Sequence, residues 1–171
     1  MDVNKLKYMI VDVDGTMTDS GIYYDDTGNE LKRFSTKDGA GFFAAQRGGI
    51  EIIVITGREC AATTRRMQEF KVKELYQNIR PKKTFIEEYM AKRGIERDEI
   101  GYIGDDINDL PSMKLCGFVG CPADSCREVL DIADYVSPYN GGHGAMRDVI
   151  EHIFRERGEW DKLVDEIYGG V

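Results

Sequence analysis

Residues 8–18 read Tyr8-Met9-Ile10-Val11-Asp12-Val13-Asp14-Gly15-Thr16-Met17-Thr18, an apolar run that leads into two aspartates and a glycine. The run is short enough to be a buried strand. Because alternate residues of a strand share one side, Asp12 and Asp14 can both point out of its carboxyl end. Two carboxylates so close repel each other, and a cation between them is the usual remedy. The pair therefore predicts a metal site in which one carboxylate is a nucleophile and the other carries protons. The alternative is an acidic turn without a function.

Three further motifs follow the aspartate pair along the chain. Residues 52–58 form a second apolar run that ends in Thr-Gly-Arg, and Lys82 begins an amphipathic helix directly after Pro81. Residues 101–109 form a third apolar run that ends in an acidic loop. Nucleophile, hydroxyl, lysine and acidic loop, in this order, resemble the four motifs of the haloacid dehalogenase superfamily of phosphatases over roughly residues 7–150.

Apolar runs alternate with helical patterns along most of the chain. Strands are predicted at 7–12, 51–56, 73–76, 100–103, 117–120 and 134–136. Helices are predicted at 38–48, 59–70, 82–93, 109–115 and 125–132. This alternation predicts an α/β fold with a doubly wound parallel sheet, as in a Rossmann-like haloacid dehalogenase core, in a single domain 1–171. Ligands of such sheets bind beyond the carboxyl ends of the strands, where Asp12, Thr56 and Asp105 would converge.

One segment departs from this alternation. Ile22-Tyr23-Tyr24 and Glu30-Leu31-Lys32-Arg33-Phe34 flank a turn-forming stretch, Asp25-Asp26-Thr27-Gly28-Asn29. The pattern predicts a β-hairpin at about 18–36. A decorative edge hairpin is the alternative, but we expect a flap over the site because the segment leaves directly from the strand that carries the nucleophile.

The chain has no room for a cap domain between its motifs. Only the hairpin and one helix fit between Asp12 and Thr56, and only one helix and one strand fit between Thr56 and Lys82. This narrows the resemblance to the capless sugar-acid phosphatases of the superfamily. In that subgroup, neighbouring subunits of a tetramer cover each site, so the resemblance implies a homotetramer.

The tail, about 137–171, contains a glycine-rich loop at 137–145 that is followed by Arg147. Glycine permits close backbone approach to a ligand, and Arg147 could clamp a carboxylate. A mobile connector with a solvated arginine is the alternative. Beyond it, an apolar stripe at helical spacing must dock on the chain's own core or on another subunit; it comprises Trp160, Leu163, Val164, Ile167 and Tyr168.

The resemblance also implies a mechanism. The Asp12 carboxylate attacks phosphorus to form an aspartyl-phosphate, and Asp14 first donates and then accepts a proton. Mg²⁺ is implied as the cofactor, held by the side chains of Asp12 and Asp105 and by the backbone carbonyl of Asp14. A carboxylate at position 14 favours rapid hydrolysis of the phospho-enzyme, which indicates a phosphatase rather than an ion pump.

The phosphoryl group has its own set of implied ligands. The Thr56 hydroxyl, the Gly57 amide and Lys82 would hold the phosphoryl oxygens. Lys83 is the rival of Lys82, but Lys82 directly follows the proline and matches the family position. Asn108, with its neighbour Asp109, could position Lys82 or the phosphate, or cap the following helix.

Two arginines bear on which substrate we expect. Arg58 directly follows Thr-Gly, and an arginine at this position resembles the enzymes that act on 3-deoxy-manno-octulosonate 8-phosphate. A glutamate at the same position resembles the enzymes that act on the nine-carbon ketodeoxynononate 9-phosphate. Arg66 matches a family arginine that could face the site or a neighbour; a solvated basic helix face is the alternative. We therefore expect a magnesium-dependent sugar-acid phosphatase of lipopolysaccharide synthesis, with the nine-carbon acid or a non-catalytic partner domain of a cytidylyltransferase as alternatives.

Composition limits the partners and the compartment. Across 171 residues, 31 acidic and 23 basic side chains give a formal charge of −8, which repels nucleic acids and anionic membranes. Residues 1–6 lack the apolar block of a signal peptide, and no run approaches the roughly 18 apolar residues of a membrane span. We expect a cytoplasmic protein with a small-molecule substrate and no nucleic-acid or membrane partner. Four cysteines without zinc-site spacing predict free thiols, namely Cys60, Cys116, Cys121 and Cys126.

Overall fold

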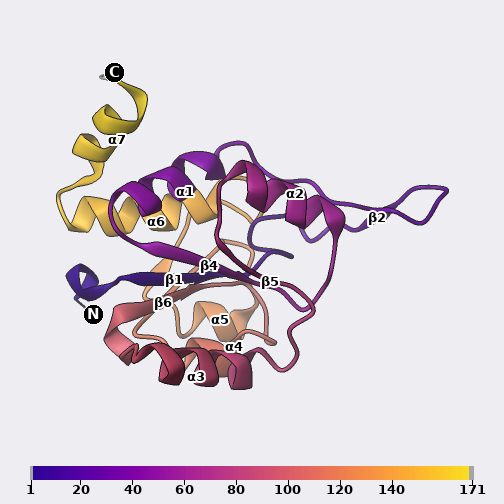
Figure 1. Ribbon diagram of the computed structural model, residues 1–171, viewed down its shortest axis with the longest axis horizontal. Helices are drawn as coiled ribbons and strands as arrows, with labels where there is room; N and C mark the ends of the chain where they lie inside the picture. Colours follow the sequence, from indigo (N-terminus) through magenta and orange to yellow (C-terminus); the bar gives the residue numbers. More distant parts are fainter. Residues whose placement is uncertain (1, 170–171) are drawn as a thin grey trace.

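A six-stranded parallel sheet forms the centre of the computed structural model, which describes residues 2–169 (Figure 1). In chain order its strands are β1 (Tyr8–Val11), β4 (Glu51–Ile55), β5 (Glu74–Tyr76), β6 (Ile100–Ile103), β7 (Phe118–Cys121) and β8 (Tyr135–Val136). Their order across the sheet is β5-β4-β1-β6-β7-β8, and every neighbouring pair is parallel. The chain therefore winds outward in both directions from β1, and the predicted doubly wound sheet is confirmed.

The register of the central strands brings the predicted motifs to one edge of the sheet. Val11, the last residue of β1, lies opposite Val54 of β4 and Ile103 of β6. Asp12 directly follows Val11, and Asp105 lies two residues beyond Ile103, at the point where the strand order reverses. This is the place at which open α/β sheets bind their ligands.

Helices cover both faces of the sheet (Figure 1). One face carries α1 (Asp38–Arg47), α2 (Ala61–Glu69) and α6 (Ala145–Glu156), with α7 (Trp160–Tyr168) beyond them. The opposite face carries α3 (Lys82–Arg93), α4 (Leu110–Met113) and α5 (Arg127–Leu130). Short 3₁₀ turns at Val3–Lys5 and Arg97–Glu99 precede β1 and β6. Both faces are thus closed to water, as the apolar strands require.

The alternation of side chains along β1 divides the interior into two cores. Met9 and Val11 point into the core under α1 and α6, whereas Ile10 points into the core under α3. On the first side, the Phe42 ring stacks on Phe70 at a centroid distance of 4.5 Å. All five side chains are nearly fully buried, so the strand that carries Asp12 is anchored from both faces.

The helices and strands form close to their predicted bounds, but α4 and α5 are shorter than the predicted 109–115 and 125–132. After α4, Leu115 and Cys116 donate backbone hydrogen bonds to residues three positions earlier rather than four. Such tight turns end an α-helix and lead the chain down into the next strand.

The predicted hairpin also forms. Strands β2 (Tyr23–Tyr24) and β3 (Glu30–Leu31) pair antiparallel, and Asp25 accepts hydrogen bonds from Thr27 and Asn29 within the turn. The hairpin projects beyond the rest of the molecule (Figure 1). Between β1 and α3, residues 2–169 contain no further domain that could act as a cap, in agreement with the sequence prediction.

The tail packs on its own chain. Trp160 and Leu163 belong to the core under α1 and α6, while Tyr168 stays exposed. In the preceding loop, a Cβ on Gly141 would lie 1.8 Å from the Gly15 carbonyl oxygen. A glycine is therefore needed where this loop crosses the Asp12 loop, and the loop is a packed element rather than a mobile connector.

The cysteines are free thiols, as the sequence predicts. Cys60, Cys116 and Cys121 are buried, Cys126 is half-buried, and all four are free thiols. Burial raises the pKa of the Cys116 thiol to about 12, so it stays protonated. Among the described residues, no helix has both the length and the apolar character needed to span a membrane.

Candidate active site

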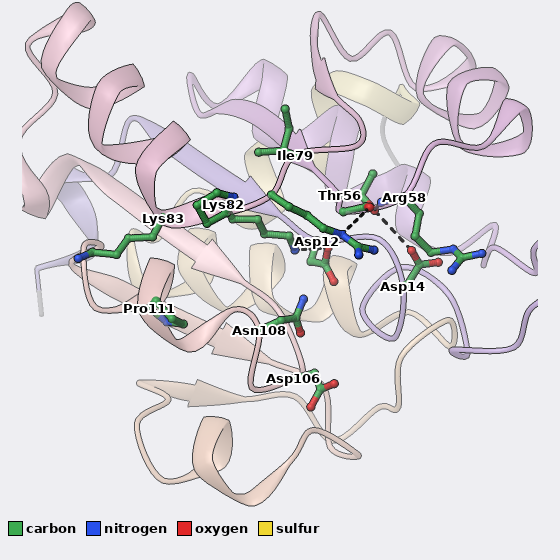
Figure 2. A pocket seen from close by; sticks show the side chains of 13 residues that line it. Asp12, Asp14, Thr56, Arg58, Ile79, Lys82, Lys83, Asp106, Asn108 and Pro111 are labelled. Carbon is green, nitrogen blue, oxygen red and sulfur yellow. Dashed lines mark hydrogen bonds and ion pairs between the residues drawn. The ribbon is translucent and has the colours of Figure 1, made fainter.

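Asp12 lies at the base of an open cavity of about 570 Å³ at the carboxyl edge of the sheet (Figure 2). The residue is 4% exposed, and its backbone N–H donates to the Ile103 carbonyl at 2.9 Å. That hydrogen bond continues the β1–β6 ladder one residue past the strand. The nucleophile predicted from the sequence is therefore held rigidly and opens onto the cavity.

Lys82 is the lysine that reaches Asp12. It starts α3, and its Nζ donates to Asp12 Oδ1 at 2.6 Å and to Asp109 Oδ1 at 2.7 Å. Burial alone would lower the pKa of Lys82, but the charges of Asp12 and Asp109 outweigh it and raise that pKa. Lys83 extends away from Asp12 (Figure 2) and pairs with Glu87 at 3.4 Å. The structure thus separates the two candidate lysines.

An acidic cluster includes the predicted nucleophile. Carboxylate oxygens of Asp12, Asp105 and Asp109 lie within 4.8 Å of one another. The Thr16 hydroxyl donates to Asp105 Oδ1 at 2.9 Å. Burial, together with the neighbouring Asp12 charge, raises the pKa of Asp105 to about 8. Burial and the Asp109 charge likewise raise the pKa of Asp12, and they outweigh the Lys82 charge, which lowers it.

Gly15 permits this close approach. A Cβ at Gly15 would lie 2.0 Å from Asp105 Oδ2, and its φ of +95° is one that side chains rarely adopt. Only glycine lets the Asp12 loop and the acidic loop come this close.

Asp14 turns away from the cluster. Its carboxylate lies 2.5 Å from Lys32 Nζ, and the Thr56 hydroxyl donates to it at 3.4 Å. Lys32 comes from the hairpin, its side chain is 0% exposed, and it also lies 3.2 Å from Glu30. The hairpin segment therefore reaches the predicted general acid, and its role as a flap stays a prediction. Sequence reasoning missed Lys32, although the period of two places Glu30 and Lys32 on one face of the hairpin.

The Thr-Gly-Arg turn after β4 forms one wall of the cavity. Thr56 is buried, and its hydroxyl accepts the Arg58 N–H at 3.3 Å. The Arg58 guanidinium is held by Glu30 at 2.7 Å and by the Tyr24 hydroxyl at 3.2 Å. Arg80, which sequence reasoning did not select, donates from Nε to the Gly57 carbonyl at 3.0 Å.

The cavity brings together most of the predicted site residues: Asp12, Asp14, Thr56, Gly57, Arg58, Lys82 and Asn108 all line it. Arg66 and Arg147 lie elsewhere in this chain. Arg66 packs over the Phe70 ring and donates to the Ser35 carbonyl at 3.1 Å. Arg147 lies over the Trp160 ring, with its terminal nitrogen 3.3 Å from Glu151.

Known proteins match this fold and its motifs. A family model for haloacid dehalogenase-like hydrolases matches residues 72–148. The 3-deoxy-D-manno-octulosonate 8-phosphate phosphatase of Escherichia coli K12 is 33% identical over 157 residues, which are 92% of this chain and 84% of the relative. This chain belongs to that phosphatase family.

Solved structures agree with this assignment. The family enzyme of Moraxella catarrhalis, solved with a magnesium ion, a phosphate ion and a KDO molecule, is 32% identical with a TM-score of 0.91. That match covers 97% of this chain and 95% of the other. A putative family member from Vibrio cholerae is 38% identical with a TM-score of 0.87, covering 92% of this chain and 88% of the other.

The donor set fits the magnesium ion that the family implies. Asp12 and Asp105 offer carboxylate oxygens, the hard ligands that Mg²⁺ prefers. Asp109 is already engaged, because Oδ1 accepts from Lys82 and Tyr102 and Oδ2 from the Asp105 N–H at 3.3 Å. Asp12 and Asp105 therefore remain the side chains available to the metal, with Asp109 as the support for Lys82.

Proposed function

We propose that this protein hydrolyses the phosphate ester of a sugar acid, most specifically 3-deoxy-D-manno-octulosonate 8-phosphate, through an aspartyl-phosphate on Asp12. One observation carries the mechanism: a buried lysine 2.6 Å from an aspartate at the switch point of the sheet, beside a cluster of carboxylates. The identity with the Escherichia coli enzyme of that name supports the substrate. Arg58, predicted from the sequence as the mark of the eight-carbon substrate, lines the cavity and supports it too.

The first half-reaction transfers the phosphoryl group to the enzyme. Asp12 attacks phosphorus, the bond to the sugar oxygen breaks, and Asp14 donates a proton to the leaving alkoxide. Lys82, the Thr56 hydroxyl and the Gly57 amide hold the phosphoryl oxygens as their charge shifts. Bound Mg²⁺ would be held by Asp12 and Asp105 and would neutralise charge between nucleophile and phosphoryl group.

The second half-reaction restores the enzyme. Water attacks phosphorus and gives a proton to Asp14, which has become a carboxylate, while the bond to Asp12 breaks and phosphate leaves. Asp14 can serve both halves because it lines the cavity and is partly exposed, with side-chain exposure of 24%.

A direct assay tests the proposal. Phosphate release is measured with the eight-carbon and the nine-carbon acid phosphates side by side, with and without Mg²⁺, and with Asp12→Asn as the blank. We expect magnesium-dependent release with preference for the eight-carbon acid. Preference for the nine-carbon acid would overturn the substrate, and no turnover of either would favour a non-catalytic partner domain.

We also propose that the active form is a cytoplasmic homotetramer. The hairpin carries large apolar side chains that are about half exposed or more: Tyr23 at 55%, Tyr24 at 64% and Leu31 at 51%. Such a patch on a projecting element is suited to another subunit. Light scattering should give four times the monomer mass, and Tyr23→Ser with Leu31→Ser should lower it; a monomer in the unaltered protein would contradict the proposal.

A further inference from the structure

Two arginines line the active-site cavity, and one of them is already neutralised. Arg58 Nη2 lies 2.7 Å from Glu30 Oε2, its Nε lies 3.3 Å from Glu30 Oε1, and Nη2 also donates to the Tyr24 hydroxyl. The Arg58 hydrogen bond lowers the pKa of Glu30, so that carboxylate is charged at neutral pH. A substrate anion that binds Arg58 must therefore compete with a bidentate internal partner.

Arg80 has no such partner. Its side chain lines the same cavity, and its Nε donates to the Gly57 carbonyl at 3.0 Å. Across residues 2–169, no ion pair joins Arg80 to a carboxylate. A guanidinium has five N–H donors, so its terminal nitrogens remain available to a ligand.

Gly57 makes room for this side chain. A Cβ on Gly57 would lie 3.0 Å from Arg80 Nε and 3.6 Å from its Nη2. The guanidinium therefore packs against the backbone of Gly57, the residue that follows Thr56. Its unpaired charge lies beside the turn that is proposed to hold phosphoryl oxygens.

We propose that Arg80 binds an oxyanion of the substrate through the terminal nitrogens of its guanidinium. The inference rests on the proposed function and names a specificity residue outside the four motifs. The oxyanion belongs either to the phosphoryl group or to the carboxylate of the sugar acid, because both present paired oxygens to a guanidinium fork. Arg58, by contrast, can bind such an oxyanion only in exchange for its internal partner Glu30.

The test compares Arg80→Gln with Arg97→Gln, an exposed arginine that likewise has no ion pair in residues 2–169 and lies outside the cavity. Glutamine can still donate to the Gly57 carbonyl, so Arg80→Gln removes the charge but retains a donor. For the eight-carbon acid phosphate we expect KM to rise about tenfold or more with kcat within about twofold. Arg97→Gln should leave both unchanged.

Two further probes identify the oxyanion. They are p-nitrophenyl phosphate, which lacks a carboxylate, and inorganic phosphate, whose Kd for the magnesium-loaded enzyme is measured by calorimetry. If KM for p-nitrophenyl phosphate and Kd for phosphate rise in parallel, Arg80 binds the phosphoryl group. If only KM for the sugar-acid phosphate rises, Arg80 binds the carboxylate.

Other outcomes would overturn the inference. Unchanged KM and Kd in Arg80→Gln would show that Arg80 binds no anion, and a loss confined to kcat would show that it only supports the Gly57 turn. If the unaltered enzyme rejects sugar-acid phosphates, the proposed function fails. The p-nitrophenyl phosphate and phosphate measurements then decide the role of Arg80 on their own.

Discussion

The Lys32 ammonium lies 2.5 Å from the Asp14 carboxylate and joins the hairpin to the proposed general acid. The Lys32 side chain has no exposed surface, and a second carboxylate, Glu30, lies 3.2 Å away. The hairpin segment therefore supplies a cation that can orient Asp14 at the edge of the cavity.

The first prediction concerns this contact. Lys32→Met leaves Asp14 and Glu30 without their shared cation, so we expect kcat to fall about tenfold and the unfolding free energy to fall by about 3 kcal/mol. Steady-state kinetics and urea unfolding measure both. Lys92→Met, at an exposed position on α3, is the control; equal effects in the two variants would show that the pair is dispensable.

The second prediction separates two neighbouring lysines. Lys82→Ala removes the buried donor to Asp12 and should lower kcat/KM about a hundredfold to a thousandfold. Lys83→Ala removes an exposed lysine that pairs with Glu87 and should leave kcat/KM within about twofold. An active Lys82→Ala enzyme would show that Lys82 has been assigned the wrong role.

The third prediction links magnesium to pH. In the metal-free protein, the pKa values of Asp12 and Asp105 are raised above those of the unfolded chain. Protonation then favours the folded state, so the associated stability is present at low pH and is lost as pH rises through these folded-state values, near 8 for Asp105. Magnesium needs the ionised carboxylates, so the rise in Tm on adding Mg²⁺ should be larger at pH 8.5 than at pH 6.

The same melting experiment contains its own control. Asp105→Asn should reduce both the magnesium-induced rise in Tm and its dependence on pH. A rise in Tm that is equal at the two pH values in the unaltered protein would contradict a metal site built on these two carboxylates.

The fourth prediction concerns Asp38, a buried aspartate at the start of α1. Burial raises the pKa of Asp38 to about 6, although it accepts the Arg147 backbone N–H at 3.1 Å. The pKa of Asp38 is higher in the folded than in the unfolded chain, so the unfolding free energy should fall as the pH is raised from about 4 to about 6. The expected fall is about 3 kcal/mol for a shift of roughly two pKa units. Asp38→Asn should flatten this part of the stability curve, whereas the exposed Asp26→Asn should not.

The core of the fold was predictable because its signals are local. An apolar run that ends at Asp12 and one that ends at Thr56 identify strands from their own composition, and parallel pairing places both ends at one edge. Helix ends were less predictable, as α4 and α5 show, because tight turns and the onset of the next strand decide where each helix stops.

The hairpin was predictable as a hairpin but not as a source of site residues. Its turn sequence identifies it, and the exposed Tyr23 and Tyr24 fit an element that projects from the molecule. That Glu30 holds Arg58 depends on how the hairpin packs against the turn after β4. No local sequence pattern encodes how the hairpin packs against that turn.

The sequence alone determined the parallel sheet, the positions of Asp12, Thr56, Lys82 and Asp105 at its carboxyl edge, and the absence of a cap between β1 and α3 in the described residues. Each of these follows from side-chain periodicity and segment length, which are properties of neighbouring residues. Tertiary structure alone decided which polar groups meet. Lys32 with Asp14, Lys82 with Asp109 and Arg80 with Gly57 each join residues 18 or more positions apart. Such pairs form only once the packed core has placed their backbones, since a side chain can bond only to partners within a few ångströms.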